Sequence, residues 1–291
     1  MNRHLGLFLL TALTTTAAGA EHYAGFQHAF HPSVTLTWWQ IGIGGLWFSV
    51  PFLGFLTAHE FGHYGMARWH GLRPSLPYYL PAPLPLTGSL GAVIVFRGHF
   101  PDRRVLFDFA AGGPIAGFVV AVAASAIGLL WSPIVKLDGA SGTLLGDPLL
   151  FQWLGDLVVG PVQDGYSVSL HPTALAGWLG LLFTMMNLVP ISQLDGGHVA
   201  YAVLRRHSQW ITLAALAAVT WAIVGLGAYT WTLWLVLLLV MMRFVGWQHP
   251  PALDDERPLD RGRLVLAAAI VGILVVCFMP VPFPDLPPIW S

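Results

Sequence analysis

The stretch IGIGGLWFSVPFLGFLTAHEFGHYGMA, residues 41–67, decides the fold of this chain. It is apolar for long enough to cross about 30 Å of hydrocarbon as a helix. Near its end it carries His59, Glu60 and His63. Residues four apart share one face of a helix, so both imidazoles are predicted to reach one metal ion. An ionisable side chain in an apolar span is costly, which indicates a function for Glu60.

The rest of the chain is apolar in the same way. Hydrophobic residues make up 56% of it and charged residues 9%, against about 25% charged residues in a typical soluble domain. An ordinary water-soluble globular protein is therefore excluded. The predicted fold class is an all-α polytopic membrane protein with about seven transmembrane helices. The apolar runs that could cross a bilayer are 5–20, 41–67, 105–131, 174–190, 210–226, 229–246 and 263–279.

The positive charges predict the orientation of these spans. With the N-terminus in the cytoplasm, Lys136 alone of the thirteen Lys and Arg residues falls in an outer segment. That bias matches the positive-inside rule, and the opposite orientation would reverse it. The net charge of −1 gives no indication of nucleic-acid binding. The predicted location is a prokaryotic cytoplasmic membrane, since no transit peptide is evident.

The loops leave little room for a soluble domain. We expect a single integral-membrane domain over residues 1–291, with a core at 38–205 and accessory spans at 210–279. The short first run ends in small residues, so residues 1–20 are either a retained span or a cleaved signal peptide.

The loop after the second span has an unusual composition. Residues 74–85 are rich in proline and are predicted to be extended. Residues 88–96 are typical of a short β-strand or hairpin. Such backbone is tolerated at membrane depth only where protein covers it or a cavity hydrates it. We therefore predict a short re-entrant β element at this point.

The five residues His59-Glu60-Phe61-Gly62-His63 form an HExxH motif. Zinc lowers the pKa of a bound water to about 7, and a carboxylate beside the first ligand can take its proton. The only cysteine is Cys277, which excludes a cysteine cage. Two histidines leave a tetrahedral zinc ion one protein ligand short.

Asp195 is the candidate for the missing ligand, within the stretch NLVPISQLDGG, residues 187–197. Pro190 removes a helical hydrogen bond and is predicted to end or kink the fourth span. Gly196 and Gly197 free the backbone beyond the aspartate. Both motifs fall at cytoplasmic ends of spans in the orientation above, so the active site is predicted to face the cytoplasm.

Three further residues near these motifs have open roles. His198 could replace or support Asp195 as a ligand. Asn187 lies about two turns before Asp195 and could donate to a developing oxyanion or to a neighbouring helix. Asp108 lies in apolar surroundings and could cap the third span or polarise the site.

The two motifs together resemble the site-2 protease family of intramembrane zinc metalloproteases, peptidase family M50. The resemblance rests on HEFGH at 59–63 and NLVPISQLDGGH at 187–198. It is strongest for the branch that includes chloroplast-type and many prokaryotic members, and it runs over about residues 5–205. The other segments similar to this family are GSLGAVI at 88–94, LFDFAAGGPIAG at 106–117 and LHPTALAGW at 170–178.

This resemblance implies one zinc ion per chain, held by His59, His63 and Asp195, with Glu60 activating water. It also implies membrane-protein substrates whose transmembrane helix is cut within or beside the bilayer. Some members of the family carry a PDZ or CBS domain, and we expect neither here. The sequence gives no signal for oligomeric state.

A membrane metal-ion transporter or metal-binding protein is the main alternative. It would also place His and Asp in spans. It has no need of Glu60 within HExxH, and it would need a polar path that the outer halves of these spans lack. A prenyl-protein protease would share HExxH, but its third ligand is a glutamate further along. The only later glutamate, Glu256, lies in a charged loop.

Overall fold

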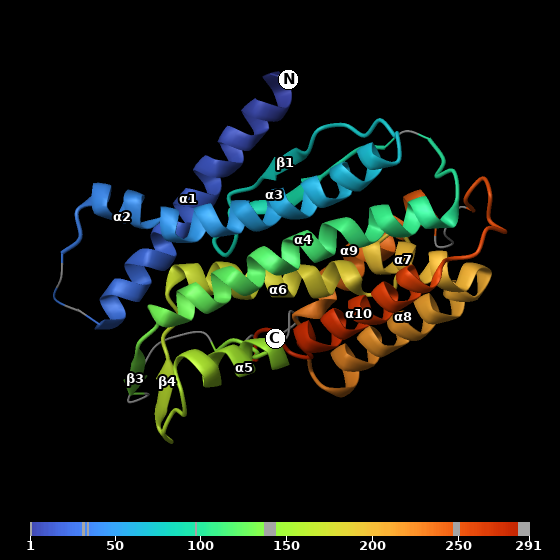
Figure 1. Ribbon diagram of the computed structural model, residues 1–291. Coiled ribbons are helices and arrows are strands. Elements are labelled where there is room, and N and C mark those ends of the chain that lie inside the picture. Colours follow the sequence, from blue (N-terminus) through green and yellow to red (C-terminus); the bar gives the residue numbers. More distant parts are fainter. Residues whose placement is uncertain are drawn as a thin grey trace. The chain divides into compact units, whose positions relative to one another are not determined.

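The computed structural model describes residues 2–30, 33, 35–96, 98–136, 144–246 and 251–284. These residues are mostly helical (Figure 1), as predicted. The α-helices are α1 (Asn2–Phe30), α2 (Trp38–Gly44), α3 (Leu46–Trp69), α4 (Arg103–Leu130), α5 (Leu149–Val158), α6 (Pro172–Leu188), α7 (Asp195–Leu204), α8 (Ser208–Gly225), α9 (Trp231–Val245) and α10 (Arg261–Cys277). The short 3₁₀ helix η1 (Arg205–His207) joins α7 to α8, and the strands are β1 (Tyr78–Pro81), β2 (Ser89–Val93), β3 (Ile134–Lys136) and β4 (Tyr166–Val168).

Among the described residues, three helical segments are long and apolar enough to cross a membrane. They are Trp38–Trp69, Arg103–Leu130 and Asp195–Gly225. The protein is therefore a membrane protein. The spans predicted at 174–190 and 229–246 correspond to shorter apolar helices, α6 with 17 residues and α9 with 15.

The first helix is longer than the predicted first span. That span was expected at 5–20, with 21–40 in an outer segment, but α1 continues without a break to Phe30. No proline interrupts the chain before Pro32, and helices end most readily near proline. The helix therefore continues beyond the stretch that was predicted to span the membrane.

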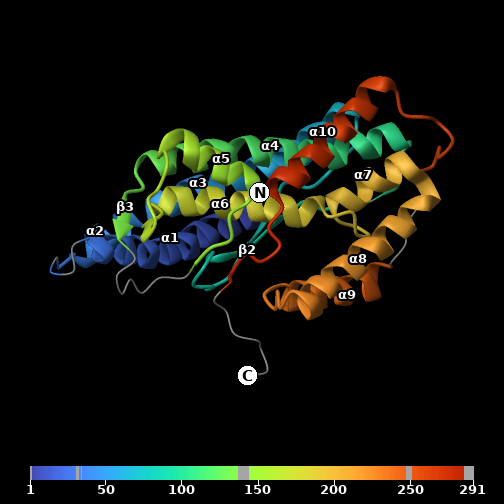
Figure 2. The same cartoon turned by 90° about the horizontal axis from the view of Figure 1, so that it is seen from below.

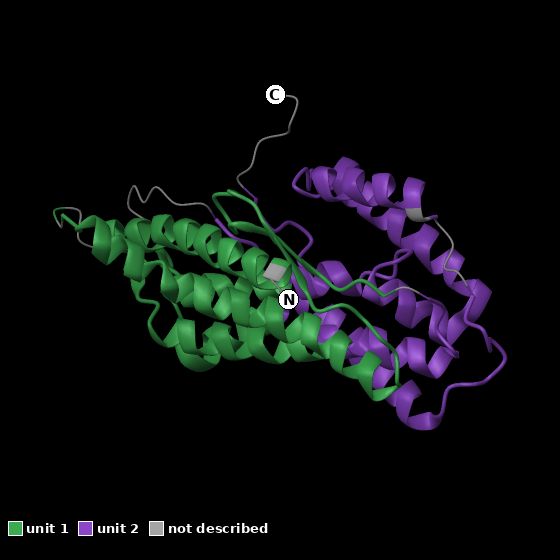
Figure 3. Ribbon diagram, turned by 90° about the horizontal axis from the view of Figure 1, so that it is seen from above, with its two compact units in different colours: residues 1–97, 115–141, 150–181 green, residues 98–114, 142–149, 182–291 purple. Residues whose placement is uncertain are grey.

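The described chain forms two compact units (Figure 3). Unit 1 comprises residues 1–97, 115–141 and 150–181, and unit 2 comprises residues 98–114, 142–149 and 182–291.

In unit 1, α1 packs closely against α3 and the β1–β2 hairpin (Figure 1). A Cβ atom added to Gly45 would lie 2.3 Å from the carbonyl oxygen of Thr16, so the two backbones are in direct contact. One turn further along, the hydroxyls of Thr15 and Ser49 form a buried hydrogen bond of 2.7 Å. Small residues with hydroxyl bonds between them allow this kind of close helix packing in a membrane protein.

The β element after α3 is present as an antiparallel hairpin. Tyr78 pairs with Val93, and the register shifts between Tyr79 and Pro81. The Tyr79 hydroxyl and the Thr57 hydroxyl of α3 lie 2.8 Å apart. The predicted extended and strand-like segments are therefore confirmed as β1 and β2.

The packing of α4 on α6 depends on glycine. A Cβ atom added to Gly177 would lie 2.3 Å from the backbone nitrogen of Ser125, and one on Gly128 would lie 2.0 Å from that of Ala174. Both contacts are with backbone, which cannot move aside as a side chain can. Small residues on both helices thus allow this close packing.

Gly177→Val is expected to destabilise unit 1 by more than about 3 kcal/mol, the upper range for overpacking, because the clash is with a helix backbone. Thermal unfolding in detergent measures the effect, with the folded fraction determined by size-exclusion chromatography after heating. Gly272→Val is the matched control, since a Cβ atom there meets nothing within 4 Å. Equal stability of the two variants would contradict the packing described above.

At the other end of α6, His171 lies buried among aromatic rings. The ring centroids of Phe26 and Trp131 lie 5.2 Å from that of His171, and that of Trp47 lies 5.6 Å away. The Nδ1 atom of His171 accepts a hydrogen bond of 3.2 Å from the backbone N–H of Thr173. This bond requires an unprotonated Nδ1, and burial lowers the pKa of His171 below the ordinary value of 6.5.

The protein is expected to lose stability as the pH falls below about 6.5. The reason is that an unfolded histidine takes up a proton there while buried His171 resists it. The contribution of neutral His171 to the free energy of unfolding is fully present above pH 6.5. It is lost as the pH falls towards the lowered pKa of His171 in the folded protein. Melting temperatures in detergent across this range measure it. His171→Asn keeps an acceptor for Thr173 and should have a flatter pH profile, so an unchanged profile would contradict the assignment.

In unit 2, the segment after α9 is bonded to the start of α4. The backbone N–H of Leu253 donates to the Phe100 carbonyl oxygen at 3.0 Å, and Arg257 forms an ion pair of 2.6 Å with Asp102. The first turns of α4 and α10 are joined in the same way, because Arg263 donates from two nitrogens to the Asp108 carboxylate. Asp108 therefore has a structural ion pair and does not cap α4 as predicted; the cap is Asp102, whose Oδ1 accepts from the backbone N–H groups of Arg104 and Val105.

Candidate metal centre

The HExxH motif lies in the second half of α3 and is buried. His59, Glu60 and His63 are 6%, 6% and 5% exposed. The Nε2 atoms of the two histidines lie 3.1 Å apart. Two nitrogens bound to one tetrahedral zinc ion at about 2.0–2.1 Å would be roughly 3.3 Å apart. The two imidazoles are thus already placed as a pair of ligands.

Gly117 on α4 is what lets a second helix pass beside His59. A Cβ atom at this position would lie 3.0 Å from Cε2 of Phe55 and 3.3 Å from Nδ1 of His59. Any larger residue would press on the ligand ring. Gly117 was not among the predicted site residues. The signal for it lay in the segment 106–117, which resembles the M50 family.

Asp195 is the first residue of α7. The chain leaves α6 at Leu188, and Leu194 is the N-cap of the next helix in an extended conformation. The predicted break after Asn187 is therefore confirmed. A carboxylate in the first turn of a helix also lies in the favourable field of the helix N-terminus.

The two glycines after Asp195 have a different role from the one predicted. A Cβ atom at Gly196 would lie 1.9 Å from the carbonyl oxygen of Leu188, and one at Gly197 would lie 2.2 Å from that of Ser192. The turn therefore folds back on the end of α6, and only glycine fits. The glycines supply space for the backbone rather than unusual torsion angles.

Buried contacts hold the turn before Asp195 in place. Ile191 is fully buried and packs with Leu238 and Met242 of α9, which runs beside α8 (Figure 2). The Thr212 hydroxyl of α8 donates to the Pro190 carbonyl oxygen at 3.1 Å. The backbone leading to the aspartate is thus fixed by α8 and α9.

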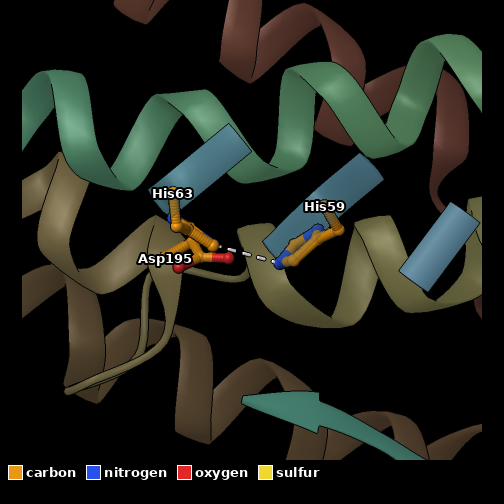
Figure 4. Close-up of side chains that lie close together, drawn as sticks. All are labelled: His59, His63 and Asp195. Atoms are coloured by element: carbon orange, nitrogen blue, oxygen red, sulfur yellow. Dashed lines mark hydrogen bonds between the residues drawn. The ribbon is translucent and has the colours of Figure 1, made fainter. Parts of the chain in front are cut away.

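The three predicted ligands come together. Each of His59, His63 and Asp195 offers one ligand atom, and these atoms all lie within 4.8 Å of one another (Figure 4). Among the described residues, no further group of three His, Cys, Asp or Glu side chains is gathered in this way, and His198 is not part of this one. Two imidazoles and a carboxylate form a donor set that zinc prefers.

Asn187 lies one residue before the end of α6 and is half-buried. Its role as an oxyanion donor stays a prediction.

The chain combines an HExxH helix with a carboxylate at the start of a later helix, and it has apolar helices long enough to span a bilayer. These features define a membrane protein with a zincin-type metal centre. The chain matches peptidase family M50 over residues 47–226, a range that contains both motifs. This protein belongs to peptidase family M50.

Individual relatives agree with this family. The chain is 30% identical over 242 residues to a probable zinc metalloprotease, EGY1, of the Arabidopsis thaliana chloroplast, covering 79% of this chain and 42% of the plant protein. The rice (Oryza sativa subsp. japonica) EGY1 is 30% identical over 239 residues, with 78% and 39% covered. Arabidopsis EGY2, also named a probable zinc metalloprotease, is 29% identical over 238 residues, with 78% and 40% covered.

The chain spans about two fifths of the length of these relatives. The resemblance to the M50 family and to its chloroplast-type branch is confirmed. The relatives' names and the donor set both indicate zinc as the metal.

Proposed function

We propose that this protein is an intramembrane zinc metalloprotease of the site-2 type, which hydrolyses peptide bonds in the transmembrane helices of other membrane proteins. The observation that carries the proposal is the gathering of His59, His63 and Asp195 beside a buried Glu60 in an M50 chain with membrane-length helices. No observation favours the metal-transporter alternative.

In the proposed mechanism, the imidazoles of His59 and His63 and the Asp195 carboxylate would hold one zinc ion per chain. Bound there, zinc would lower the pKa of a water molecule and polarise the scissile carbonyl. Glu60 takes a proton from the attacking water and passes it to the leaving amine, as the new C–O bond forms and the C–N bond breaks. The amide of Asn187 donates to the developing oxyanion.

The β1–β2 hairpin is proposed as the element that receives the unwound substrate. A protease needs its substrate extended, and a strand can add to an exposed sheet edge. The hairpin has only two strands, and Leu90 of β2 is exposed. We propose that it is re-entrant, at the depth of the metal centre.

The proposed arrangement in the membrane has seven spans, with the N-terminus and the active site towards the cytoplasm of a prokaryotic cell. The scarcity of Lys and Arg in the outer segments supports this orientation. We further propose that residues 1–291 act as one metalloprotease domain with its core at 38–205.

The test is a cleavage assay in proteoliposomes that contain a panel of single-span membrane proteins. Mass spectrometry should find products cut within or beside the span, and removal of zinc with a chelator should abolish them. Zinc flux across the vesicle wall without any cleavage product would overturn the protease proposal and establish a transporter.

A further inference from the structure

A cavity of about 540 Å³ lies in unit 2, apart from the residues of the proposed reaction. Gly197 and Tyr201, which lie four residues apart on α7, line this cavity. Residues of η1 and of the first turns of α8 line it as well. All the lining residues belong to unit 2.

The lining favours an anion. Arg205, Arg206 and His207 line the cavity with a single acid, Asp255. Arg205 is bonded to Asp255 at 3.0 Å and also to Glu256, so two carboxylates face this one positive charge and more than offset it. Arg206 is exposed and forms no ion pair with any residue that the structure describes. Its guanidinium is therefore the positive charge that remains for a ligand.

Hydrogen-bond donors lie beside this charge. Ser208 lines the cavity with a buried side chain and begins α8. A guanidinium and a hydroxyl match the oxygens of a phosphate group.

The backbone of the cavity is strained at two positions. Ser192, with φ 45°, and Arg205, with φ 56°, are the only non-glycine residues of positive φ in the described chain. Both line the cavity. Such conformations are costly for residues with a side chain, and they gather at ligand sites. The strain is what a site shaped for a ligand would retain.

The surroundings of the cavity indicate a lipid as the source of the phosphate. α8 has 18 residues, or about 27 Å, which nearly spans the hydrocarbon by itself. The exposed Arg206 and His207 directly before it mark the polar boundary of the bilayer. Trp210, in the first turn of α8, is 63% exposed, as is common for tryptophan at the headgroup level.

We propose that this cavity binds the headgroup phosphate of an anionic phospholipid, with Arg206 as the main contact and with the acyl chains along α8. A basic pocket at the end of a span suits such a headgroup. A zwitterionic headgroup fits less well, because its cation would meet Arg206. The proposal requires the membrane location of the protein and does not depend on its proteolytic activity.

Native mass spectrometry of the full chain in detergent tests this proposal, with phosphatidylglycerol or phosphatidylcholine added. The wild type should retain one phosphatidylglycerol in preference to phosphatidylcholine. Arg206→Gln should weaken this binding by about tenfold, the effect of losing one charge-assisted contact. The affinity of Arg206→Lys for phosphatidylglycerol should lie between those of the wild type and Arg206→Gln, because lysine keeps the charge but lacks the planar guanidinium.

The matched control is Arg261→Gln, which removes an exposed positive charge elsewhere in unit 2. It should bind phosphatidylglycerol as the wild type does. Equal weakening of phosphatidylglycerol binding in Arg206→Gln and Arg261→Gln would show that only general surface charge matters. That result would overturn the proposal. Equal retention of the two lipids, or displacement of the lipid by millimolar inorganic phosphate, would also overturn it.

Discussion

Glu60→Gln is expected to keep its zinc and to lose peptide-bond cleavage by about a thousandfold or more. Glutamine has the shape of glutamate but cannot accept a proton, and a positioned general base contributes roughly 10²–10⁴ to a rate. Glu60 is 6% exposed, so bulk water cannot replace it. The rate of product formation in proteoliposomes, measured beside the zinc content of the same sample, checks the prediction.

The control for this variant is Glu21→Gln, the same change at an exposed residue of α1. It should cleave at the wild-type rate. Full activity of Glu60→Gln would remove Glu60 as the base. Loss of zinc from Glu60→Gln would mean that the side chain supports the metal instead.

Asp195→Ala is expected to weaken zinc binding by at least about 100-fold, since even the partners of metal ligands contribute 10–100-fold to affinity. Cleavage should fall with it. Zinc retention during dialysis against a graded series of chelator concentrations measures the affinity. The variant leaves the buried turn at Ile191 in place, so the fold should persist.

His198→Ala is the matched control, because His198 lies on the same helix but outside the gathered ligands. It should bind zinc as the wild type does. Full zinc retention in Asp195→Ala together with loss in His198→Ala would exchange the roles of the two residues.

The grouping of His59, His63 and Asp195 could be predicted from the sequence because their chemistry and spacing are local. His59 and His63 lie one helical turn apart, and Pro190 marks the break before Asp195. The hairpin was also predictable, since proline and β-branched residues set its two halves apart from the flanking spans.

What the sequence did not predict depends on contacts between distant residues. The pairing of Asp108 with Arg263 joins positions 155 residues apart. The space required at Gly117 and Gly196 depends on which backbone or ring lies opposite. The length of α1 was missed because apolar residues alone defined the predicted span, whereas the helix continues to Phe30, two residues before Pro32.

The most direct test of the metal centre is X-ray absorption at the zinc edge of the wild-type protein, purified in detergent without chelator. We predict one zinc ion per chain, with nitrogen and oxygen ligands at about 2.0–2.2 Å, two of them imidazoles. A zinc ion with fewer than two imidazoles, a sulfur ligand from Cys277, or no zinc at all would contradict the site described here.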